Sequence, residues 1–317
     1  MSAQVAVTTL GEALIVLDPL VRGPLRHVDT FVKRVGGAEL NVAVALSRLG
    51  HRAGWAGALG DDEFGQQILA FLRGEGVDVS GARLDPDAPT GVYFKERRAL
   101  DRLRVLYYRM GSAASRERFE DLDTDLLLSG NVLHLTGITP ALSESCRNLT
   151  ERLVDAAIER GILFSFDANV RWRLFGNRDP REVLRPLAER ADLLFLSDEE
   201  AELLLGGSSP ESVQKALDGM RTQTVVVHGT GGAFAIEGSK VTQKAAYPVA
   251  VVDTVGAGDA FVAGFLSGRL RGWEVGECLR LANACGACAV TVPGDVEGMP
   301  TEAEALSLLH DRPGRER

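Results

Sequence analysis

The sequence lacks the features of several protein classes. Cysteine is scarce, with four residues in 317, too few and too clustered for a disulfide framework in a chain of this length. Two of the four, Cys285 and Cys288, have the spacing of a redox or zinc pair. They lie in a run of small residues with a helical pattern, and no second cysteine pair or nearby histidine completes a metal site. We therefore interpret them as packed small side chains.

Long hydrophobic runs and an excess of basic residues are also absent. No apolar run approaches the roughly 20 residues that cross a bilayer, and no basic segment precedes Val5-Ala6-Val7. We expect a cytoplasmic protein with no membrane partner. The chain has 35 lysines and arginines against 44 acidic residues, a formal net charge of −9, which argues against a nucleic-acid partner. Any anion site must therefore be built from a few local groups.

Hydrophobic residues make up 45% of the chain, enough for a substantial core in one large α/β domain or two smaller ones. Short apolar segments alternate with amphipathic stretches, which predicts a mostly parallel sheet covered by helices on both faces. The expected strands are 5–10, 53–59, 132–135, 162–166, 193–196, 224–228 and 233–237. The expected helices are 40–49, 63–73, 143–160, 181–190, 198–205, 260–271 and 274–290.

Two stretches have a period-two pattern instead. Residues 12–35 alternate but contain prolines and a glycine, which predicts exposed strands with turns. Residues 91–96 and 103–109 alternate on either side of a charged turn at 100–102, which predicts a hairpin rich in aromatic residues and arginine. The two stretches could together form a small projecting sheet, and an ordinary edge hairpin is the alternative.

The stretch from Asp253 to Phe261 carries the clearest chemistry. The β-branched run 249–252 before it predicts a strand, and a helical pattern follows it. A glycine turn that opens a helix is an anion site, because backbone N–H groups and the helix dipole point toward the ligand. Gly256, Ala257 and Gly258 would supply these groups. A carboxylate at Asp259, beside a phosphate, suits a base that deprotonates an attacking hydroxyl, although it could instead only complement the helix N-terminus.

This stretch closely resembles the C-terminal signature of the ribokinase-like sugar kinases, the phosphofructokinase B superfamily. Residues 36–43, followed by 59–65, resemble the N-terminal signature of the same family. The resemblance implies one ribokinase-like domain over residues 1–317, with a doubly wound, mostly parallel sheet. It also implies a small β-sheet lid formed by about 12–35 and 90–110. A kinase of this kind binds ATP and Mg²⁺, and a monovalent-cation site near Asp253 stays open.

Polar residues at the ends of predicted strands extend the resemblance to the nucleotide side. Asp167-Ala168-Asn169-Val170-Arg171 resembles the family's Asp-x-Asn-x-Arg segment, and Ser197-Asp198-Glu199-Glu200 resembles its Asn-x-x-Glu motif, with serine in place of asparagine. Glu200 would then hold Mg²⁺ through water. The residues implied for ATP binding are Asn169, Arg171, Ser197, Gly229, Thr230, Gly231, Gly232, Gly256, Ala257, Gly258 and Asn283. For Asn283, a buried amide that only satisfies backbone groups is the alternative.

The segment from Tyr107 to Ser115 resembles that of the 2-keto-3-deoxygluconate kinases, one branch of the family. Two arginine forks, at Arg109 and Arg171, suit a substrate carboxylate, whereas Arg104 and Arg173 are interpreted as solvated. The residues implied for substrate binding are Gly37, Asn41, Tyr93, Tyr107, Tyr108, Arg109, Arg171, Asp259 and Asp295.

The expected activity is therefore phosphorylation by ATP of the C6 hydroxyl of 2-dehydro-3-deoxy-D-gluconate. Alternatives are a fructokinase or ribokinase of the same family, or a catalytically silent sugar-binding regulator. We also expect a homo-oligomer, because exposed sheet edges are often covered by a second subunit.

Overall fold

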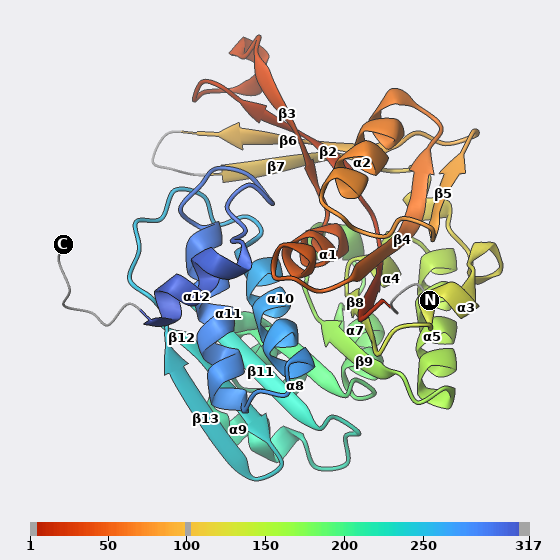
Figure 1. Cartoon of the computed structure of the whole chain (residues 1–317). Coiled ribbons are helices and arrows are strands. Elements are labelled where there is room, and N and C mark those ends of the chain that lie inside the picture. The colour runs from red at the N-terminus through yellow and green to blue at the C-terminus, as the bar shows by residue number, and fades with distance from the viewer. Residues whose placement is uncertain (1–4, 99–102, 311–317) are drawn as a thin grey trace.

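The protein is described from a computed structural model of the whole chain, in which residues 5–98 and 103–310 are placed. The predicted charged turn at 100–102 lies outside the described residues. The remaining elements divide into two sheets and the helices that surround the larger one (Figure 1).

The larger sheet has the strand order β13-β12-β11-β10-β9-β8-β1-β4-β5 within the described residues. Its strands pair in parallel from β5 to β11, and only β12 and β13 run antiparallel to their neighbours. The bounds are β1 Val7–Leu10, β4 Ala53–Gly60, β5 Ala82–Asp85, β8 Val132–Thr136, β9 Leu163–Asp167, β10 Leu193–Ser197, β11 Thr224–Gly229, β12 Gly232–Glu237 and β13 Lys240–Ala245.

Helices cover both faces of this sheet. On one face pack α1 (Ala38–Arg48), α2 (Glu63–Gly74), α10 (Ala257–Leu270), α11 (Val275–Ala289) and α12 (Glu302–His310). On the other face pack α5 (Glu144–Glu159), α7 (Arg181–Ala188), α8 (Asp198–Leu205) and α9 (Pro210–Ala216). Short helices fill the connections: α3 Thr124–Leu127, α4 Thr139–Leu142 and α6 Trp172–Phe175, with 3₁₀ turns at Leu25–His27, Ala114–Arg116 and Phe119–Asp121.

Side chains of the central strands alternate between the two helical layers, as a sheet buried on both faces requires. Val226 of β11 packs in the layer with α10, whereas its neighbours Val225 and Val227 pack in the layer with α8. This alternation explains why the central strands are nearly continuous apolar runs. The predicted doubly wound α/β fold is confirmed.

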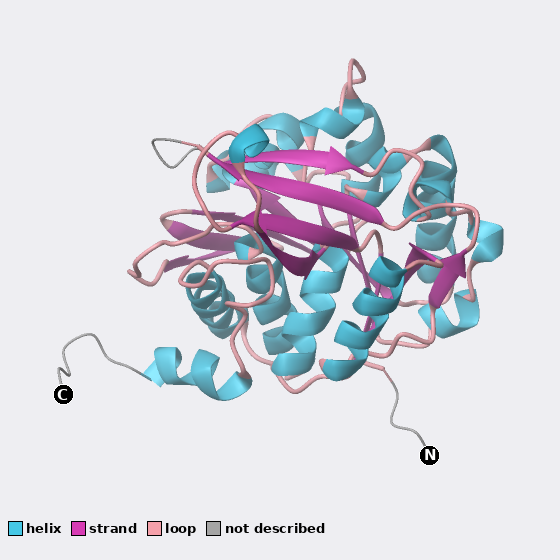
Figure 2. Ribbon diagram, turned by 90° about the horizontal axis from the view of Figure 1, so that it is seen from above, coloured by secondary structure: helices cyan, strands magenta, loops and turns pink. Residues whose placement is uncertain are grey.

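Four further strands form a separate small sheet with the order β3-β2-β6-β7. They are β2 Leu14–Pro19, β3 Phe31–Gly36, β6 Gly91–Arg97 and β7 Leu103–Tyr108. Only β2 and β6 pair in parallel. The small sheet lies at the top of the view in Figure 1, and Figure 2 shows it from above, stretched across the molecule. The two period-two stretches thus form the expected small sheet.

The predicted strand at 249–252 is wrong. These residues have no strand pairing, and the side chains of Val249, Val251 and Val252 are 36%, 63% and 53% exposed. β-Branched residues fit a pleated, half-buried surface, and this segment has no such surface to pack on. At the end of the segment, the Val252 N–H donates a hydrogen bond to the Val290 carbonyl over 2.7 Å. The helix that follows, predicted over 260–271, spans Ala257–Leu270 and so begins directly at the glycine turn.

The edge strands β5 and β13 were not predicted, because neither shows a clear apolar pattern; β13 is mostly exposed. The four cysteines are free and, apart from half-buried Cys288, buried, as expected for packed small side chains. In the part of the chain that the structure describes, none of the helices has the length and apolar character needed to span a bilayer.

Candidate active site

A cavity of about 650 Å³ lies between the small sheet and the large domain. The small sheet contributes residues of β2, β6 and β7, and the large domain contributes residues that follow β8, β9 and β10 together with the start of α10. In an open α/β sheet the carboxyl ends of the strands are where ligands bind. Thirteen residues predicted to form the site line this cavity: Gly37, Asn41, Tyr93, Tyr107, Arg109, Asn169, Arg171, Ser197, Glu200, Gly256, Gly258, Asp259 and Asp295.

The glycine turn at the start of α10 has the geometry that its sequence predicts. Gly256 is the N-cap residue, with φ 79 in the left-handed region that favours glycine. A Cβ atom added there would also lie 2.1 Å from the backbone oxygen of Asp295, so only glycine fits. The N–H groups at the start of the helix therefore point toward the cavity with the positive end of the helix dipole.

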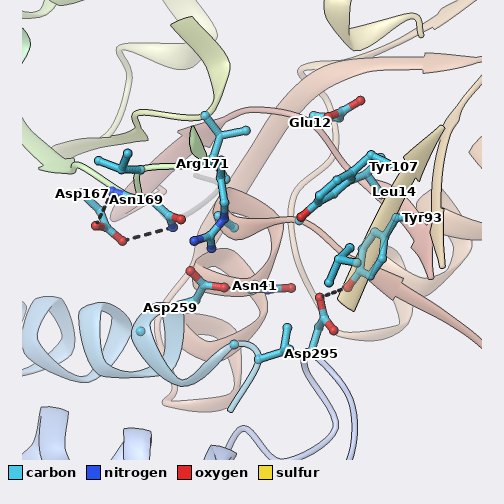
Figure 3. A pocket seen from close by; sticks show the side chains of 18 of the residues that line it. Glu12, Leu14, Asn41, Tyr93, Tyr107, Asp167, Asn169, Arg171, Asp259 and Asp295 are labelled. Atoms are coloured by element: carbon cyan, nitrogen blue, oxygen red, sulfur yellow. Dashed lines mark hydrogen bonds between the residues drawn. The ribbon is translucent and has the colours of Figure 1, made fainter. Parts of the chain in front are cut away.

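Asp259 lies in the first turn of this helix and is 7% exposed. Its Oδ2 accepts a hydrogen bond from Asn41 Nδ2 over 2.7 Å, which fixes the carboxylate (Figure 3). Burial raises the pKa of Asp259 to about 6, and the Asn41 hydrogen bond and the charge of Arg171 limit the rise. A carboxylate with this pKa is ionised at neutral pH and is a stronger base than an exposed one, which suits proton abstraction.

The loop after β9 brings Arg171 to the cavity. Asn169 turns the chain with φ 38, and its backbone N–H donates to Asp167 Oδ1 over 3.2 Å. Figure 3 shows the Arg171 guanidinium pointing toward Asn41 and Asp259. Among the described residues no carboxylate forms an ion pair with it, although its charge acts against the rise in the pKa of Asp167 and Asp259. Arg171 therefore supplies a cation that is available to a ligand.

Ser197 and Glu200 form a capping box at the start of α8. The Ser197 N–H donates to Glu200 Oε2 over 2.8 Å, and Ser197 Oγ accepts from the Glu200 N–H over 3.3 Å. Glu200 Oε1 also accepts from the Val170 N–H over 2.6 Å. Glu200 thus joins the loops after two neighbouring strands while lying at the cavity.

On the opposite side of the cavity, residues of the small sheet surround the position expected for a sugar. The Tyr93 hydroxyl donates to Asp295 Oδ2 over 2.6 Å, and the rings of Tyr93 and Tyr107 lie 5.4 Å apart. Gly37 has φ 146, and a Cβ there would lie 2.3 Å from the backbone oxygen of Glu12. Backbone and aromatic surfaces are thus brought close to the cavity.

Arg109 differs from the expectation of a free carboxylate-binding fork. It is 8% exposed and forms an ion pair with the buried carboxylate of Glu12. Glu12 Oε1 also accepts from Ser112 Oγ over 2.9 Å. Arg109 lines the cavity, with its guanidinium over the Tyr107 ring at 4.9 Å, but its charge is already matched within the protein.

Seven predicted site residues do not line this cavity. Tyr108 is 67% exposed and packs against Phe94 with ring centroids 5.5 Å apart, so it contributes to the other side of the small sheet. The amide of Asn283 donates to the backbone oxygens of Lys244 and Ala245, which is the alternative role considered for it. The other five are Ala257 at the start of α10 and the residues at the turn between β11 and β12: Gly229, Thr230, Gly231 and Gly232.

Sequence reasoning missed several residues of the site. Arg104 and Arg173 are exposed, as interpreted, but they also line the cavity, and Arg173 Nη1 donates to the Val105 oxygen of the small sheet over 2.6 Å. Lys95 is fully buried between Asp253 and Asp295. The alternation of Tyr93, Lys95 and Arg97 in β6 could have indicated that all three face the same way.

The chain was compared with known proteins. Residues 5–302 match the model of the pfkB family carbohydrate kinases. The 2-dehydro-3-deoxygluconokinase of Thermoproteus tenax is 38% identical, over 97% of this chain and 95% of the relative. The enzyme of the same name from Bacillus subtilis is 36% identical, over 95% and 94%. Fructokinase-1 of Oryza sativa is 35% identical, over 96% and 97%.

Solved structures agree with the sequence matches. The 2-dehydro-3-deoxygluconokinase of Thermotoga maritima superposes with a TM-score of 0.88 at 28% identity, over 96% of this chain and 98% of the other. An Escherichia coli protein in complex with ATP and Mg²⁺ superposes with a TM-score of 0.88 at 26% identity, over 96% and 99%. The chain is therefore a sugar kinase by fold and sequence. It belongs to the pfkB family of carbohydrate kinases.

Proposed function

We propose that the protein transfers the γ-phosphoryl group of ATP to the C6 hydroxyl of 2-dehydro-3-deoxy-D-gluconate. One observation carries the proposal: a single cavity holds the buried carboxylate of Asp259 at a helix N-terminus and, facing it, the unpaired guanidinium of Arg171. Asp259 suits a hydroxyl that must be deprotonated, and Arg171 suits a carboxylate. A sugar acid carries both groups.

Asp259 takes the proton of the attacking hydroxyl, and Asn41 keeps its carboxylate oriented during the transfer. Backbone N–H groups from Gly256 to Asp259 stabilise the negative charge on the transferring phosphoryl group. Arg171 holds the acid end of the sugar so that the distant hydroxyl lies in line with the phosphorus. The small sheet serves as the lid of a single ribokinase-like domain, and it excludes water that would otherwise hydrolyse ATP.

The residues present fit a magnesium ion that binds mainly through ATP oxygens and water. Within the described residues no three side chains of the metal-binding types gather around one point. The two oxygens of Glu200 accept the N–H groups of Val170 and Ser197, and each retains a lone pair for a water on the ion. When bound, Mg²⁺ neutralises charge on the phosphate oxygens. Asp253 already contacts Lys95 and Arg97, so the proposal includes no monovalent cation.

The substrate assignment is tested with Arg171→Met. A charge-assisted hydrogen bond to a carboxylate contributes roughly 1.5–3 kcal/mol, so the variant should raise the KM for 2-dehydro-3-deoxy-D-gluconate by about 10- to 100-fold. Steady-state kinetics with the sugar acid and with fructose check this. Arg178→Met, an exposed arginine of the same loop region, serves as the control.

A fructokinase is the second candidate, because Glu12 neutralises Arg109 and leaves one free guanidinium where two were expected. An unchanged KM for the sugar acid in Arg171→Met, with efficient turnover of fructose by the wild type, would favour it. Arg109→Met is informative only together with Glu12→Gln, since the single change leaves a buried carboxylate without its partner.

We propose a reducing, cytoplasmic location, which the four free cysteines support. A homo-oligomer is supported by the two edges of the small sheet, the strands β3 and β7, which a second subunit could cover.

A further inference from the structure

Three donors on one face of β6 reach from the small sheet into the large domain. They are Tyr93, Lys95 and Arg97, which occupy alternate positions of the strand and therefore point the same way. Lys95 has no exposed surface, although lysine is rarely buried unless its charge is paired. Its Nζ lies 3.2 Å from Asp253 Oδ2 and 2.9 Å from Asp295 Oδ1. One buried ammonium thus bridges two aspartates that are distant in sequence.

The two aspartates lie on either side of the glycine turn. Asp253 Oδ1 accepts from the Val255 N–H over 3.2 Å, which shapes the chain just before Gly256. A Cβ atom added to Gly256 would lie 2.1 Å from the backbone oxygen of Asp295. The loop that carries Asp295 is therefore packed directly against the turn. Asp253 thus contacts the turn through its carboxylate, and Asp295 contacts it through its backbone.

Opposite charges compensate one another in this bridge, which allows it to be buried. Two cations, Lys95 and Arg97, contact Asp253, and Arg97 also bonds Asp18 Oδ1 over 3.1 Å. Burial alone would raise the pKa of Asp253, but the charge of Lys95 and the Arg97 hydrogen bond hold it below its ordinary value. Asp295 otherwise receives only the Tyr93 hydroxyl among the described side chains. Loss of Lys95 would leave Asp295 without a cation and Asp253 with Arg97 alone, so nothing would bridge the two carboxylates.

We propose that Lys95 is a positioning residue for phosphoryl transfer, which couples the place of the small sheet to the shape of the anion-binding turn. Its ammonium draws Asp253 and Asp295 together, and this holds the turn from Gly256 to Asp259 in its working geometry. The inference rests on the proposed kinase function of this site. Lys95 does not line the cavity and acts only through the two aspartates.

The test compares Lys95→Ala with Lys33→Ala, a control lysine of the same sheet whose ammonium lies over the Phe64 ring. A displacement of the turn by about 1 Å is expected to lower kcat by roughly 10²-fold in Lys95→Ala. The sugar KM should change less than kcat. Added methylammonium, which fits the space of the missing side chain, should restore part of kcat in a saturable way in Lys95→Ala and should leave Lys33→Ala unchanged.

A second readout does not depend on turnover. Amide hydrogen exchange over residues 253–259 should become about tenfold faster in Lys95→Ala, with methylammonium reversing the change. A wild type that phosphorylates no sugar, combined with faster exchange in the variant, would refute the proposed function and, with it, a role of Lys95 in phosphoryl transfer, and would leave only its ordering of the turn. Unchanged kcat and unchanged exchange in Lys95→Ala would overturn the inference.

If Lys95→Ala does not fold, Lys95→Met combined with Asp253→Asn removes one charge of each sign and keeps the region balanced. This variant should fold and should have the same low kcat. It should gain nothing from methylammonium, because it lacks both the ammonium group and one of the two carboxylates that bind it. A folded double variant with the kcat of the wild type would show that the bridge has no positioning role.

Discussion

Asp259 is the residue on which the chemistry depends, and its surroundings tune it through burial and one hydrogen bond. Asp259→Asn should lower kcat by roughly 10² to 10⁴-fold, the usual contribution of a general base, while leaving sugar and nucleotide binding almost unchanged. Because burial raises the pKa of Asp259 to about 6 and the base must be ionised, wild-type kcat/KM should fall as pH drops below about 6.

Steady-state kinetics from pH 5 to pH 8 and calorimetric binding check this expectation. Asp125→Asn, at an exposed carboxylate paired with Arg160, is the control. Near-normal turnover of Asp259→Asn would show that the carboxylate only complements the helix N-terminus.

Glu39 is a second buried acid, close to the site but with a structural role. Its Oε1 accepts from the hydroxyls of Thr136 and Thr139 over 2.7 and 3.1 Å, and Oε2 has no partner among the described residues. Burial raises its pKa from 4.5 to about 7. The folded protein therefore holds a proton on Glu39 between pH 4.5 and 7 that the unfolded chain releases, so stability falls as pH rises through this window.

Glu39→Gln removes this titration while keeping the shape of the side chain. The variant should be more stable than the wild type at pH 8, by up to about 3 kcal/mol, and nearly equal to it at pH 4.5. Urea unfolding at the two pH values measures the difference, with exposed Glu159→Gln as the control. Equal effects of Glu39→Gln at both pH values would contradict the raised pKa.

At the scale of elements, the motif at the start of α8 caps the helix and also lines the cavity. Ser197 was assigned to the nucleotide, yet its hydroxyl caps α8 through the Glu200 N–H. Ser197→Ala should therefore cost about 1 kcal/mol of stability, the usual value of an N-cap. The KM for ATP should stay the same, because the cap is the only hydrogen bond that the described residues give this hydroxyl. Thermal unfolding and nucleotide kinetics test this, with the half-buried Ser115→Ala as the comparison. A large rise in the KM for ATP at unchanged stability would return Ser197 to the nucleotide site.

Most elements could be predicted because their cause is local. Strands such as Leu193–Ser197 are continuous apolar runs, and helices such as Glu144–Glu159 have a regular amphipathic pattern and a serine cap. The segment at 249–252 has the composition of a strand, but no neighbouring strand accepts it. Strand β13 has the reverse character, since it is mostly polar and forms because β12 offers it an edge.

At the scale of the whole molecule, the site joins residues that are far apart in the chain. Asn41 and Asp259 meet across 218 positions, and Lys95 and Asp253 meet across 158. The signatures around Gly37 and Gly256 predicted that these two regions belong together. The Glu12 partner of Arg109 and the bridge at Lys95 could not be predicted, because nothing local identifies which buried carboxylate a distant cation will meet.

The central claim is that one cavity both deprotonates a hydroxyl and holds a substrate carboxylate. The most direct measurement is ADP release by the wild type with Mg²⁺ and ATP, comparing 2-dehydro-3-deoxy-D-gluconate, fructose and ribose at equal concentrations. A cavity that binds a substrate carboxylate should give a strong preference for the sugar acid. Preference for a neutral sugar would contradict the carboxylate assignment while keeping the kinase, and no turnover with any of the three would favour a silent sugar-binding regulator.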